Sequence, residues 1–413
     1  MRCSNRSWCV CYFAPVIAAV LLVAGCSSGE STPTTVSNVA PTPISAPTPG
    51  PTPTPDAKTL RGQAARTGFL IGTSFSWGAA DEPYKLTLAK EFNYVTVFPT
   101  MLNVEPQRGT FRFAVRDVEV AFAKEHGLKI KGHPLVWGNT RVLPAWLKFD
   151  QADCGGWSPA ELDQIMKEWI QATVSHFKGS ITTWEVVNEP FKRDDRTMSP
   201  GPYTPSDLQD SCWKRILGEG YIAKAFSYAH EADPDALLTL NDQFNNRFGG
   251  GTFSGVAQGF PSSPGNDRLQ RGKFLELVRK LKAQGVPIHV AGYQMHLDAQ
   301  KGISATYLED FRDFLQKAQE IGIQAHVTEM DVYLPTGLLP DPAQKLKEIY
   351  KGVLNTCLQF ANCTAFTVWG ISDKDWSPGP SASTPTGAAP LLFDAKYQPK
   401  PAYYGVMEAL KRE

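Results

Sequence analysis

From residue 58 onward, short apolar runs rich in β-branched residues alternate with longer stretches in which apolar residues recur every three or four positions. The first pattern is typical of buried strands and the second of amphipathic helices. The eight predicted strands are FLIGTSF (69–75), YVTVF (94–98), LKIKGHPLVW (128–137), TTWEVVNE (182–189), LLTLND (237–242), HVAGYQMHL (289–297), QAHVTEMDV (324–332) and TAFTVWGI (364–371). Eight strands, each followed by a helix, predict an α/β fold of the (β/α)8, or TIM-barrel, class.

Two of the predicted intervening helices begin with recognisable N-terminal capping patterns. Ser158, Pro159 and Glu161 form a capping-box pattern with proline at the first helical position, and Asp341-Pro342 repeats the device. An open, doubly wound sheet is the alternative fold. Such a sheet would not need eight successive strand–helix units, and no glycine fingerprint follows the first strand.

The N-terminus has the pattern of an export signal. Arg2 and Arg6 precede the apolar run at 14–25, which is too short to span a bilayer comfortably. We therefore interpret residues 1–25 as a signal peptide. The run ends in Val-Ala-Gly before Cys26, which resembles a bacterial lipobox and predicts lipidation of Cys26. The alternative is an ordinary signal peptide with a chance cysteine.

Residues 26–57 contain this cysteine and a tract of serine, threonine and proline with almost no apolar residues. Such a tract cannot bury a core and is typical of an extended linker. We expect an exported protein, either a bacterial cell-surface lipoprotein held to the membrane only by its lipid anchor or a secreted protein.

The charge balance limits the partners. The 413 residues contain 41 basic and 41 acidic side chains, and this neutrality argues against nucleic acid as a partner. The ten tryptophans are compatible with stacking on sugar faces. We expect a monomer.

Four cysteines lie beyond the predicted signal and lipid-attachment region, at Cys154, Cys212, Cys357 and Cys363. An even number in an exported chain indicates disulfides. Cys357 and Cys363 are close in sequence, which leaves Cys154 and Cys212 as the second pair. A metal site is the alternative, but no CxxC or HxxxH spacing supports one. We expect neither a metal nor an organic cofactor.

Polar side chains collect at one end of the predicted strands. In chain order they are His133, Trp137, Asn188, Glu189, Asn241, Asp242, Gln294, His296, Glu329, Asp331 and Trp369. Active sites of (β/α)8 barrels are built from the C-terminal ends of the strands. Glu189 and Glu329 would therefore meet at one mouth, and paired carboxylates are what glycosidic bond cleavage requires. One must stay protonated to donate to the leaving oxygen, and the other must stay ionised to attack.

At these positions the chain resembles glycoside hydrolase family 10, the retaining endo-1,4-β-xylanases. The matching segments are GHPLVW (132–137), WEVVNE (184–189), YQMHL (293–297), VTEMDV (327–332), FTVWGISDKDW (366–376) and PLLFDAKYQPKPAYY (390–404). Cys357 and Cys363 also resemble a disulfide that the family often has. The resemblance runs from about residue 60 to the C-terminus, and we assign residues 58–413 as the catalytic domain.

The resemblance implies a role for each matching residue. Glu189 is expected to be the acid/base and Glu329 the nucleophile, with Asn188 contacting the sugar 2-hydroxyl and His296 orienting Glu329. The other residues expected to contact substrate are His133, Trp137, Asn241, Gln294, Trp369 and Trp376.

One segment departs from the family pattern. After the second strand the family normally reads close to Glu-Asn-x-x-Lys, whereas this chain has Phe98, Pro99 and Leu102 at those positions. Apolar groups cannot replace side chains that hydrogen-bond sugar hydroxyls, so xylan binding on the non-reducing side should weaken. Gly138 also replaces a histidine that often follows the family's tryptophan.

The resemblance favours an endo-1,4-β-xylanase that hydrolyses xylan by double displacement. The departure keeps a second hypothesis open, a β-glycosidase with shifted specificity for another β-glycan or for a glycoside with an apolar substituent. A third is a non-catalytic carbohydrate-binding protein, although a pure binder has no need of two buried carboxylates.

Overall fold

The computed structural model describes residues 56–75, 80–192, 198, 201–244, 264–299, 305–334, 339–375 and 389–411. Residues Thr52–Glu413 form one compact unit. The predicted signal peptide, the predicted lipidation at Cys26, most of the linker and Trp376 lie outside the described residues.

Nine parallel strands form the centre of the described chain. They are β1 (Leu70–Ser74), β2 (Tyr94–Val97), β3 (Lys129–Gly132), β4 (Val136–Trp137), β5 (Thr183–Asn188), β6 (Leu237–Gln243), β7 (Val290–Asp298), β8 (Gln324–Tyr333) and β9 (Cys363–Val368). Neighbours follow the order β3-β2-β1-β9-β8-β7-β6-β5-β4, and an additional β3–β5 pairing closes the sheet. Because β3 and β4 both pair with β5, they share one position, and the barrel has eight strands.

The predicted strand at 128–137 is wrong as one continuous element, because it is divided into β3 and β4. Pro134 has no N–H group to donate to a neighbouring strand. On either side of it the backbone changes partner: His133 donates to the carbonyl of Val97 on β2, and Leu135 donates to the carbonyl of Glu185 on β5. The division lets the chain leave β2 while keeping the barrel closed.

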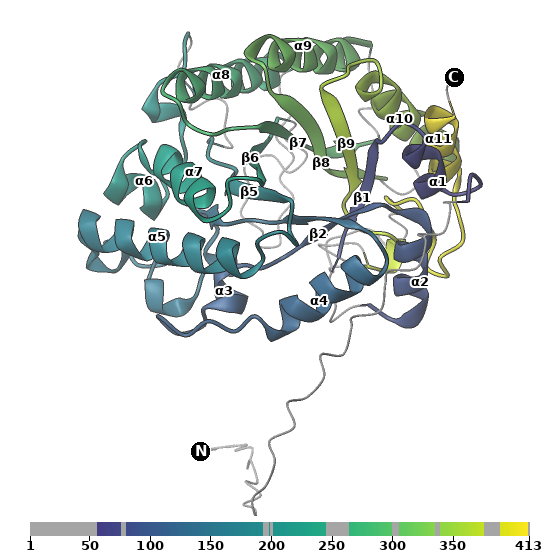
Figure 1. Cartoon of the computed structure of the whole chain (residues 1–413). Coiled ribbons are helices and arrows are strands. Elements are labelled where there is room, and N and C mark those ends of the chain that lie inside the picture. The colour runs from purple at the N-terminus through teal and green to yellow at the C-terminus, as the bar shows by residue number, and fades with distance from the viewer. Residues whose placement is uncertain are drawn as a thin grey trace, which may run out of the picture. The chain divides into compact units, whose positions relative to one another are not determined.

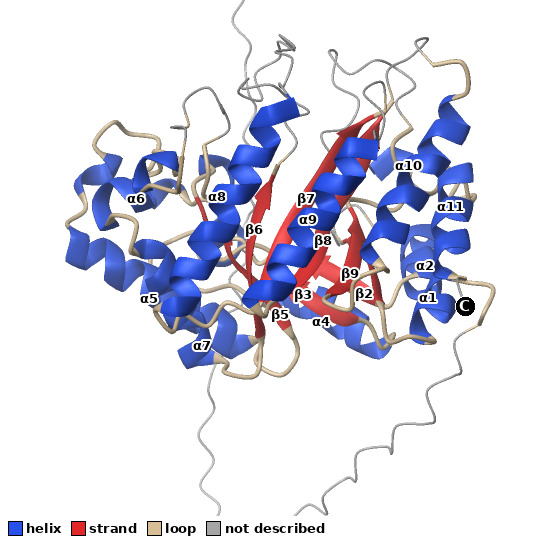
Figure 2. Cartoon of the chain, turned by 90° about the horizontal axis from the view of Figure 1, so that it is seen from above, coloured by secondary structure: helices blue, strands red, loops and turns tan. Residues whose placement is uncertain are grey.

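Helices lie outside the strands, as Figure 1 shows for α4, α5 and α8–α10. The helices are α1 (Leu60–Ala65), α2 (Glu82–Glu91), α3 (Met101–Val104), α4 (Ala114–Glu125), α5 (Pro159–His176), α6 (Cys212–Leu217), α7 (Tyr221–Ala232), α8 (Pro264–Ala283), α9 (Ala305–Ile321), α10 (Pro342–Cys357) and α11 (Pro401–Leu410). In Figure 2, α8 and α9 run alongside the strands that they cover. Within the described part of the chain, none of these helices combines the length and apolar character needed to cross a membrane.

The predicted helix starts are confirmed in atomic detail. Ser158 accepts from the backbone of Glu161, and the Glu161 side chain returns a bond to the backbone of Ser158. Asp341 accepts from the backbone of Gln344 at the start of α10. These caps satisfy backbone donors that the first helical turn leaves unpaired.

The strands are buried on both faces, as expected for a parallel sheet covered by helices. All six residues of β5 are buried, and so are eight of the ten residues of β8. Two disulfides stabilise the unit, Cys154–Cys212 and Cys357–Cys363, which confirms both predicted pairs.

Candidate active site

The predicted polar residues gather at the C-terminal ends of the strands. Trp137 ends β4 and Asn188 ends β5, while Asn241 lies near the end of β6. Gln294 lies at the middle of β7 and His296 in its second half, Glu329 and Asp331 lie in the second half of β8, and Trp369 follows β9 directly. Side chains that are far apart in sequence therefore meet at one mouth of the barrel.

Glu189 is held by two neutral donors. The indole Nε1 of Trp137 donates to one carboxylate oxygen at 2.9 Å, and the Nε2 of Gln294 donates to the other at 3.0 Å. The residue is only 8% exposed. These two bonds fix the position of its carboxylate.

The backbone of Glu189 adopts a conformation that is unusual for its type. Its φ is +53°, in the left-handed region, although it is not a glycine and precedes Pro190. The backbone N–H donates to the carbonyl of Asn241 at 2.8 Å, and its carbonyl accepts from Gln209 at 3.0 Å. Strain of this kind persists where surrounding bonds hold it, and it is concentrated at functional sites.

Glu329 has a different set of partners. The Nδ2 of Asn241 donates to Oε1 at 3.1 Å, and the Nε2 of His296 lies 3.1 Å from Oε2. The Nδ1 of His296 lies 3.1 Å from Asp331. Burial would lower the pKa of His296, but Asp331 and Glu329 outweigh it and raise that pKa to about 9. His296 is therefore positively charged at neutral pH beside Glu329.

A single hydrogen-bond network joins the two glutamates. Asn241, which binds Glu329, also donates to the Oδ1 of Asn188 at 3.0 Å. Gln294, which binds Glu189, donates to the same oxygen at 3.1 Å. Among the described residues, the Asn188 Nδ2 and the Gln294 Oε1 are buried without a protein partner. Because buried polar atoms are normally satisfied, these two are suited to bonding a ligand.

Bulges in the strands turn neighbouring residues into the same space. Along β7 and β8, Tyr293 pairs with Val327 but Gln294 pairs with Glu329, so Thr328 is an extra residue. Thr328 donates to Asn241 at 2.7 Å, and Glu329 bonds the same asparagine. In a regular strand these successive side chains would face opposite sides. A second shift between Glu185 and Val187 affects β5 in the same region.

Glu185 is a buried residue in contact with the site that the sequence analysis did not single out. One of its oxygens contacts the Nδ1 of His133 at 2.7 Å and the Nδ2 of Asn241 at 2.8 Å, and the other accepts from Lys131 at 3.1 Å. Burial would raise the pKa of Glu185, but the charges of His133 and Lys131 lower it to about 2. A glutamate inside an otherwise apolar strand was the sequence signal.

The atoms of His133, Glu185 and Glu329 could in principle hold a metal ion, because one ligand atom from each lies within 4.8 Å of the others. Lys131 already supplies Glu185 with a positive charge, and His296 does so for Glu329. Both carboxylates of this cluster therefore have a basic side chain of the protein beside them.

Aromatic rings line the mouth. The ring centroids of His133 and Trp369 are 5.3 Å apart, and that of Trp137 is 5.9 Å from His133. Phe98 contacts both His133 and Trp369 edge-on, at 5.4 and 5.5 Å. Flat rings of this kind match the apolar faces of pyranose sugars.

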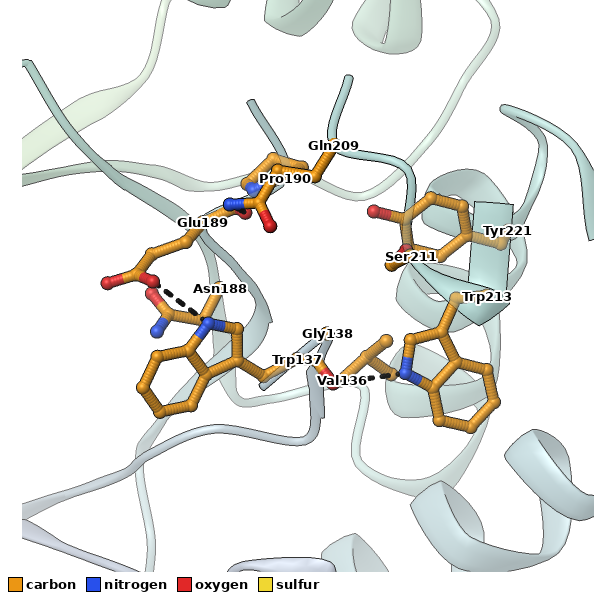
Figure 3. A pocket seen from close by; sticks show the side chains of 10 residues that line it. All are labelled: Val136, Trp137, Gly138, Asn188, Glu189, Pro190, Gln209, Ser211, Trp213 and Tyr221. Carbon is orange, nitrogen blue, oxygen red and sulfur yellow. Dashed lines mark hydrogen bonds between the residues drawn. The ribbon is translucent and has the colours of Figure 1, made fainter. Parts of the chain in front are cut away.

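A pocket lies beside the backbone of Glu189 (Figure 3). Trp137 and Glu189 form one side of it, and Ser211, Trp213 and Tyr221 form the other. The indole of Trp213 donates to the carbonyl of Trp137 at 3.1 Å and so links the two sides. A Cβ atom at Gly138 would come within 2.9 Å of the Cβ of Ser211, so the close approach of α6 favours glycine there.

Comparisons with known proteins agree with this geometry. The family model of glycosyl hydrolase family 10 matches residues 59–249 and 264–409. Endo-1,4-beta-xylanase B of Thermotoga neapolitana is 32% identical over 351 residues, covering 84% of this chain and 88% of that protein. Exoglucanase XynX of Acetivibrio thermocellus is 31% identical over 343 residues, covering 80% of this chain but 27% of that longer protein. The crystal structure of xylanase 10B from Thermotoga petrophila in complex with xylobiose has a TM-score of 0.69 and 30% identity, covering 86% and 97% of the two chains.

A (β/α)8 barrel with two buried, networked glutamates at the C-terminal mouth defines a glycoside hydrolase. The family match extends over most of the chain and includes both glutamates. The chain belongs to glycosyl hydrolase family 10.

Proposed function

We propose that this protein is a retaining endo-1,4-β-xylanase. The observation that carries the proposal is the network in which Asn188, Asn241 and Gln294 hold Glu189 and Glu329 at one mouth. Relatives named as endo-1,4-β-xylanases and a related structure bound to xylobiose support xylan as the substrate.

The different surroundings of the two glutamates support their roles. The charged imidazole of His296 faces Glu329 and suits a carboxylate that must stay ionised until it attacks. The Glu189 carboxylate accepts from Trp137 and Gln294, which fix it at the mouth where it can give and take a proton during turnover.

The proposed reaction has two displacements. In the first, a Glu329 oxygen bonds the anomeric carbon as the glycosidic C–O bond breaks, and Glu189 gives its proton to the leaving oxygen. In the second, Glu189 takes a proton from water, and the water oxygen bonds the anomeric carbon as the bond to Glu329 breaks. Each step inverts the carbon, so the product keeps the β configuration. The free Asn188 Nδ2 can donate to the sugar 2-hydroxyl during both steps.

Azide added to the two alanine variants, with one aryl β-xylobioside as substrate, can show which glutamate is the nucleophile and which is the acid/base. In Glu329→Ala, azide can enter where the carboxylate was and form an α-glycosyl azide. In Glu189→Ala, the covalent intermediate still forms with a good leaving group, and azide attacks its opposite face to give the β-azide. Without azide, we expect Glu329→Ala to lose activity by a factor on the order of 10⁴ or more.

Proton NMR of the azide products shows whether each variant forms the α- or the β-glycosyl azide. The opposite assignment of α and β products would exchange the two roles. Initial release of α-configured sugar by the wild-type enzyme would reject double displacement altogether.

A shifted specificity is the second candidate, and Phe98, Pro99 and Leu102 are the observation that favours it. These side chains offer no hydrogen bonds to sugar hydroxyls. One relative is named as an exoglucanase and not as a xylanase. Hydrolysis of mixed-linkage glucan faster than xylan would favour this candidate.

We also propose that the protein is exported and held at the bacterial surface by a lipid on Cys26, with residues 27–57 as the linker. The lipobox-like sequence and the serine-, threonine- and proline-rich tract support this. Full-length protein made in a bacterial host should enter the detergent phase of a Triton X-114 extract, and Cys26→Ala should stay in the aqueous phase. Equal partitioning of the two would count against the anchor.

A further inference from the structure

The apolar segment after β2 reaches the proposed active site through Phe98. We call the side chains of Phe98, Pro99 and Leu102 the Phe98 wall. Phe98 contacts the rings of His133 and Trp369, and the Nδ1 of His133 lies 4.0 Å from Glu329. The ring of His133 therefore lies between Phe98 and the proposed nucleophile, Glu329.

The order of side chains places the Phe98 wall on the non-reducing side of the cleavage point. Trp137 bonds Glu189, His133 lies next to Trp137, and Phe98 lies next to His133. Glu189 protonates the leaving oxygen in the proposed mechanism. Phe98 is at the other end of this row, so it faces the substrate on the non-reducing side of the sugar that carries the anomeric carbon.

The backbone of the wall is fixed. The carbonyl of Phe98 accepts from the backbone of Thr100 at 2.8 Å and from the side chain of Arg116 at 3.2 Å. Arg116 is largely buried and pairs with Glu119 at 3.0 Å. A surface held in this way loses little conformational entropy when a ligand binds it.

The chemistry of the wall excludes some partners and favours others. Phenylalanine, proline and leucine side chains have no donor or acceptor, so a sugar hydroxyl turned against them loses water without replacement. Phe98 is partly exposed, so part of its apolar ring remains open at the mouth. Pro99 is buried, and Leu102, in the following helix α3, is 40% exposed. An ester on that hydroxyl removes the unsatisfied donor and adds a methyl group that the wall can bury.

We propose that the Phe98 wall binds an O-acetyl ester on the xylosyl residue that precedes the reacting sugar on its non-reducing side. The enzyme's substrate class is then acetylated β-1,4-xylan chains. This inference rests on the proposed xylanase function and specifies its substrate.

A pair of small substrates tests the inference. One is 4-nitrophenyl β-xylobioside, and the other carries a single acetyl group on its non-reducing xylose, with the 2-O- and 3-O-acetyl isomers made separately. The leaving group and the reacting sugar are identical in all of them. We expect kcat/KM to rise about fourfold for at least one isomer, the factor that burial of one methyl group gives.

Three variants and a control show whether the wall is responsible. Phe98→Glu and Leu102→Lys each add a polar group, and F98E/P99N/L102K restores the family pattern. We expect each to lower the ratio of kcat/KM for acetylated over plain substrate, with the triple variant bringing it below one. Leu86→Lys places the same change at a leucine of α2 that is 62% exposed, and it should leave the ratio unchanged. Circular dichroism confirms that each protein is folded, and the exposed Leu102 site keeps the test available if the triple variant does not fold.

The outcomes separate the inference from the function on which it rests. If the wild-type enzyme cleaves the plain xylobioside but both acetyl isomers are slower, the inference is wrong and the xylosidic activity stands. If neither plain nor acetylated substrate is cleaved, both are wrong. If the ratio rises but the wall variants do not change it, acetyl preference arises elsewhere and the role of the Phe98 wall is rejected.

Discussion

Glu185 lies beneath the proposed catalytic residues and connects them to a buried lysine. Its oxygens bond Asn241, His133 and Lys131, and it is fully buried. A buried pair of charges adds little net stability, but removing one partner leaves the other charge without compensation. Glu185 therefore controls both the stability of the barrel interior and the position of Asn241.

We expect Glu185→Gln to lower the free energy of unfolding by about 3–5 kcal/mol at neutral pH, because Lys131 then keeps a buried charge without a counter-charge. The double variant Lys131→Met/Glu185→Gln removes both charges and should recover part of that loss. Chemical denaturation of the three proteins at pH 7 measures the difference. A double variant less stable than Glu185→Gln alone would contradict this account.

The lowered pKa of Glu185 also sets the direction of a pH effect. Its pKa falls from an ordinary value of 4.5 to about 2 on folding, so its contribution to stability is present above pH 4.5 and is lost as the pH falls towards 2. The wild-type protein should lose stability over this window more steeply than Glu185→Gln. Parallel curves for the two proteins would show that Glu185 does not carry the effect.

The sequence predicted the polar residues at and near the C-terminal ends of the apolar runs, but not Glu185 and Lys131 within them. Asn188, Glu189 and Glu329 interrupt apolar runs, so their placement at a barrel mouth could be inferred from periodicity and fold class alone. Glu185 and Lys131 lie within the runs, where alternation does not reveal which neighbour is close enough to balance a charge. That information depends on the register between β3 and β5, which pairs Lys131 with Thr183.

At the level of elements, the strands were predictable where they were regular. The predicted run at 324–332 and the observed β8 differ by one residue. The apolar pattern of this run has clear polar limits, and only one strand length between such limits fits the barrel. The run at 128–137 was divided because Pro134 cannot donate to a strand. A proline inside a predicted strand was therefore the sequence feature that indicated the division.

The strand bulges could not be predicted from the periodicity of apolar residues. The extra residue Thr328 lets two successive side chains of β8 reach Asn241. A strict alternation would have turned either Thr328 or Glu329 away from the site. The orientation of the proposed nucleophile thus depends on a local irregularity that only the pairing with β7 reveals.

At the scale of the whole molecule, the two disulfides lie in different parts of the barrel. Cys363 begins β9, so the Cys357–Cys363 bond lies at the N-terminal end of the strands. Cys212 begins α6, and Trp213 next to it bonds the backbone of Trp137, which in turn holds Glu189. In this fold the C-terminal end of the strands carries function and the opposite end carries stability. The Cys154–Cys212 bond should therefore affect both properties.

We expect Cys154→Ala/Cys212→Ala to lower the free energy of unfolding by about 4 kcal/mol and Cys357→Ala/Cys363→Ala by about 2 kcal/mol. The sequence separations of 58 and 6 residues give these values, because a longer closed loop restricts the unfolded chain more. All four cysteines are buried, so the loss of packing is similar in the two variants.

Only the first variant, Cys154→Ala/Cys212→Ala, should also lose kcat/KM, since α6 would no longer be tied to the loop at Cys154. Guanidinium unfolding and xylobioside hydrolysis below the unfolding transition measure the two effects separately. Equal losses of activity would mean that α6 does not position Trp137, and equal losses of stability would mean that loop length is not what distinguishes the two bonds.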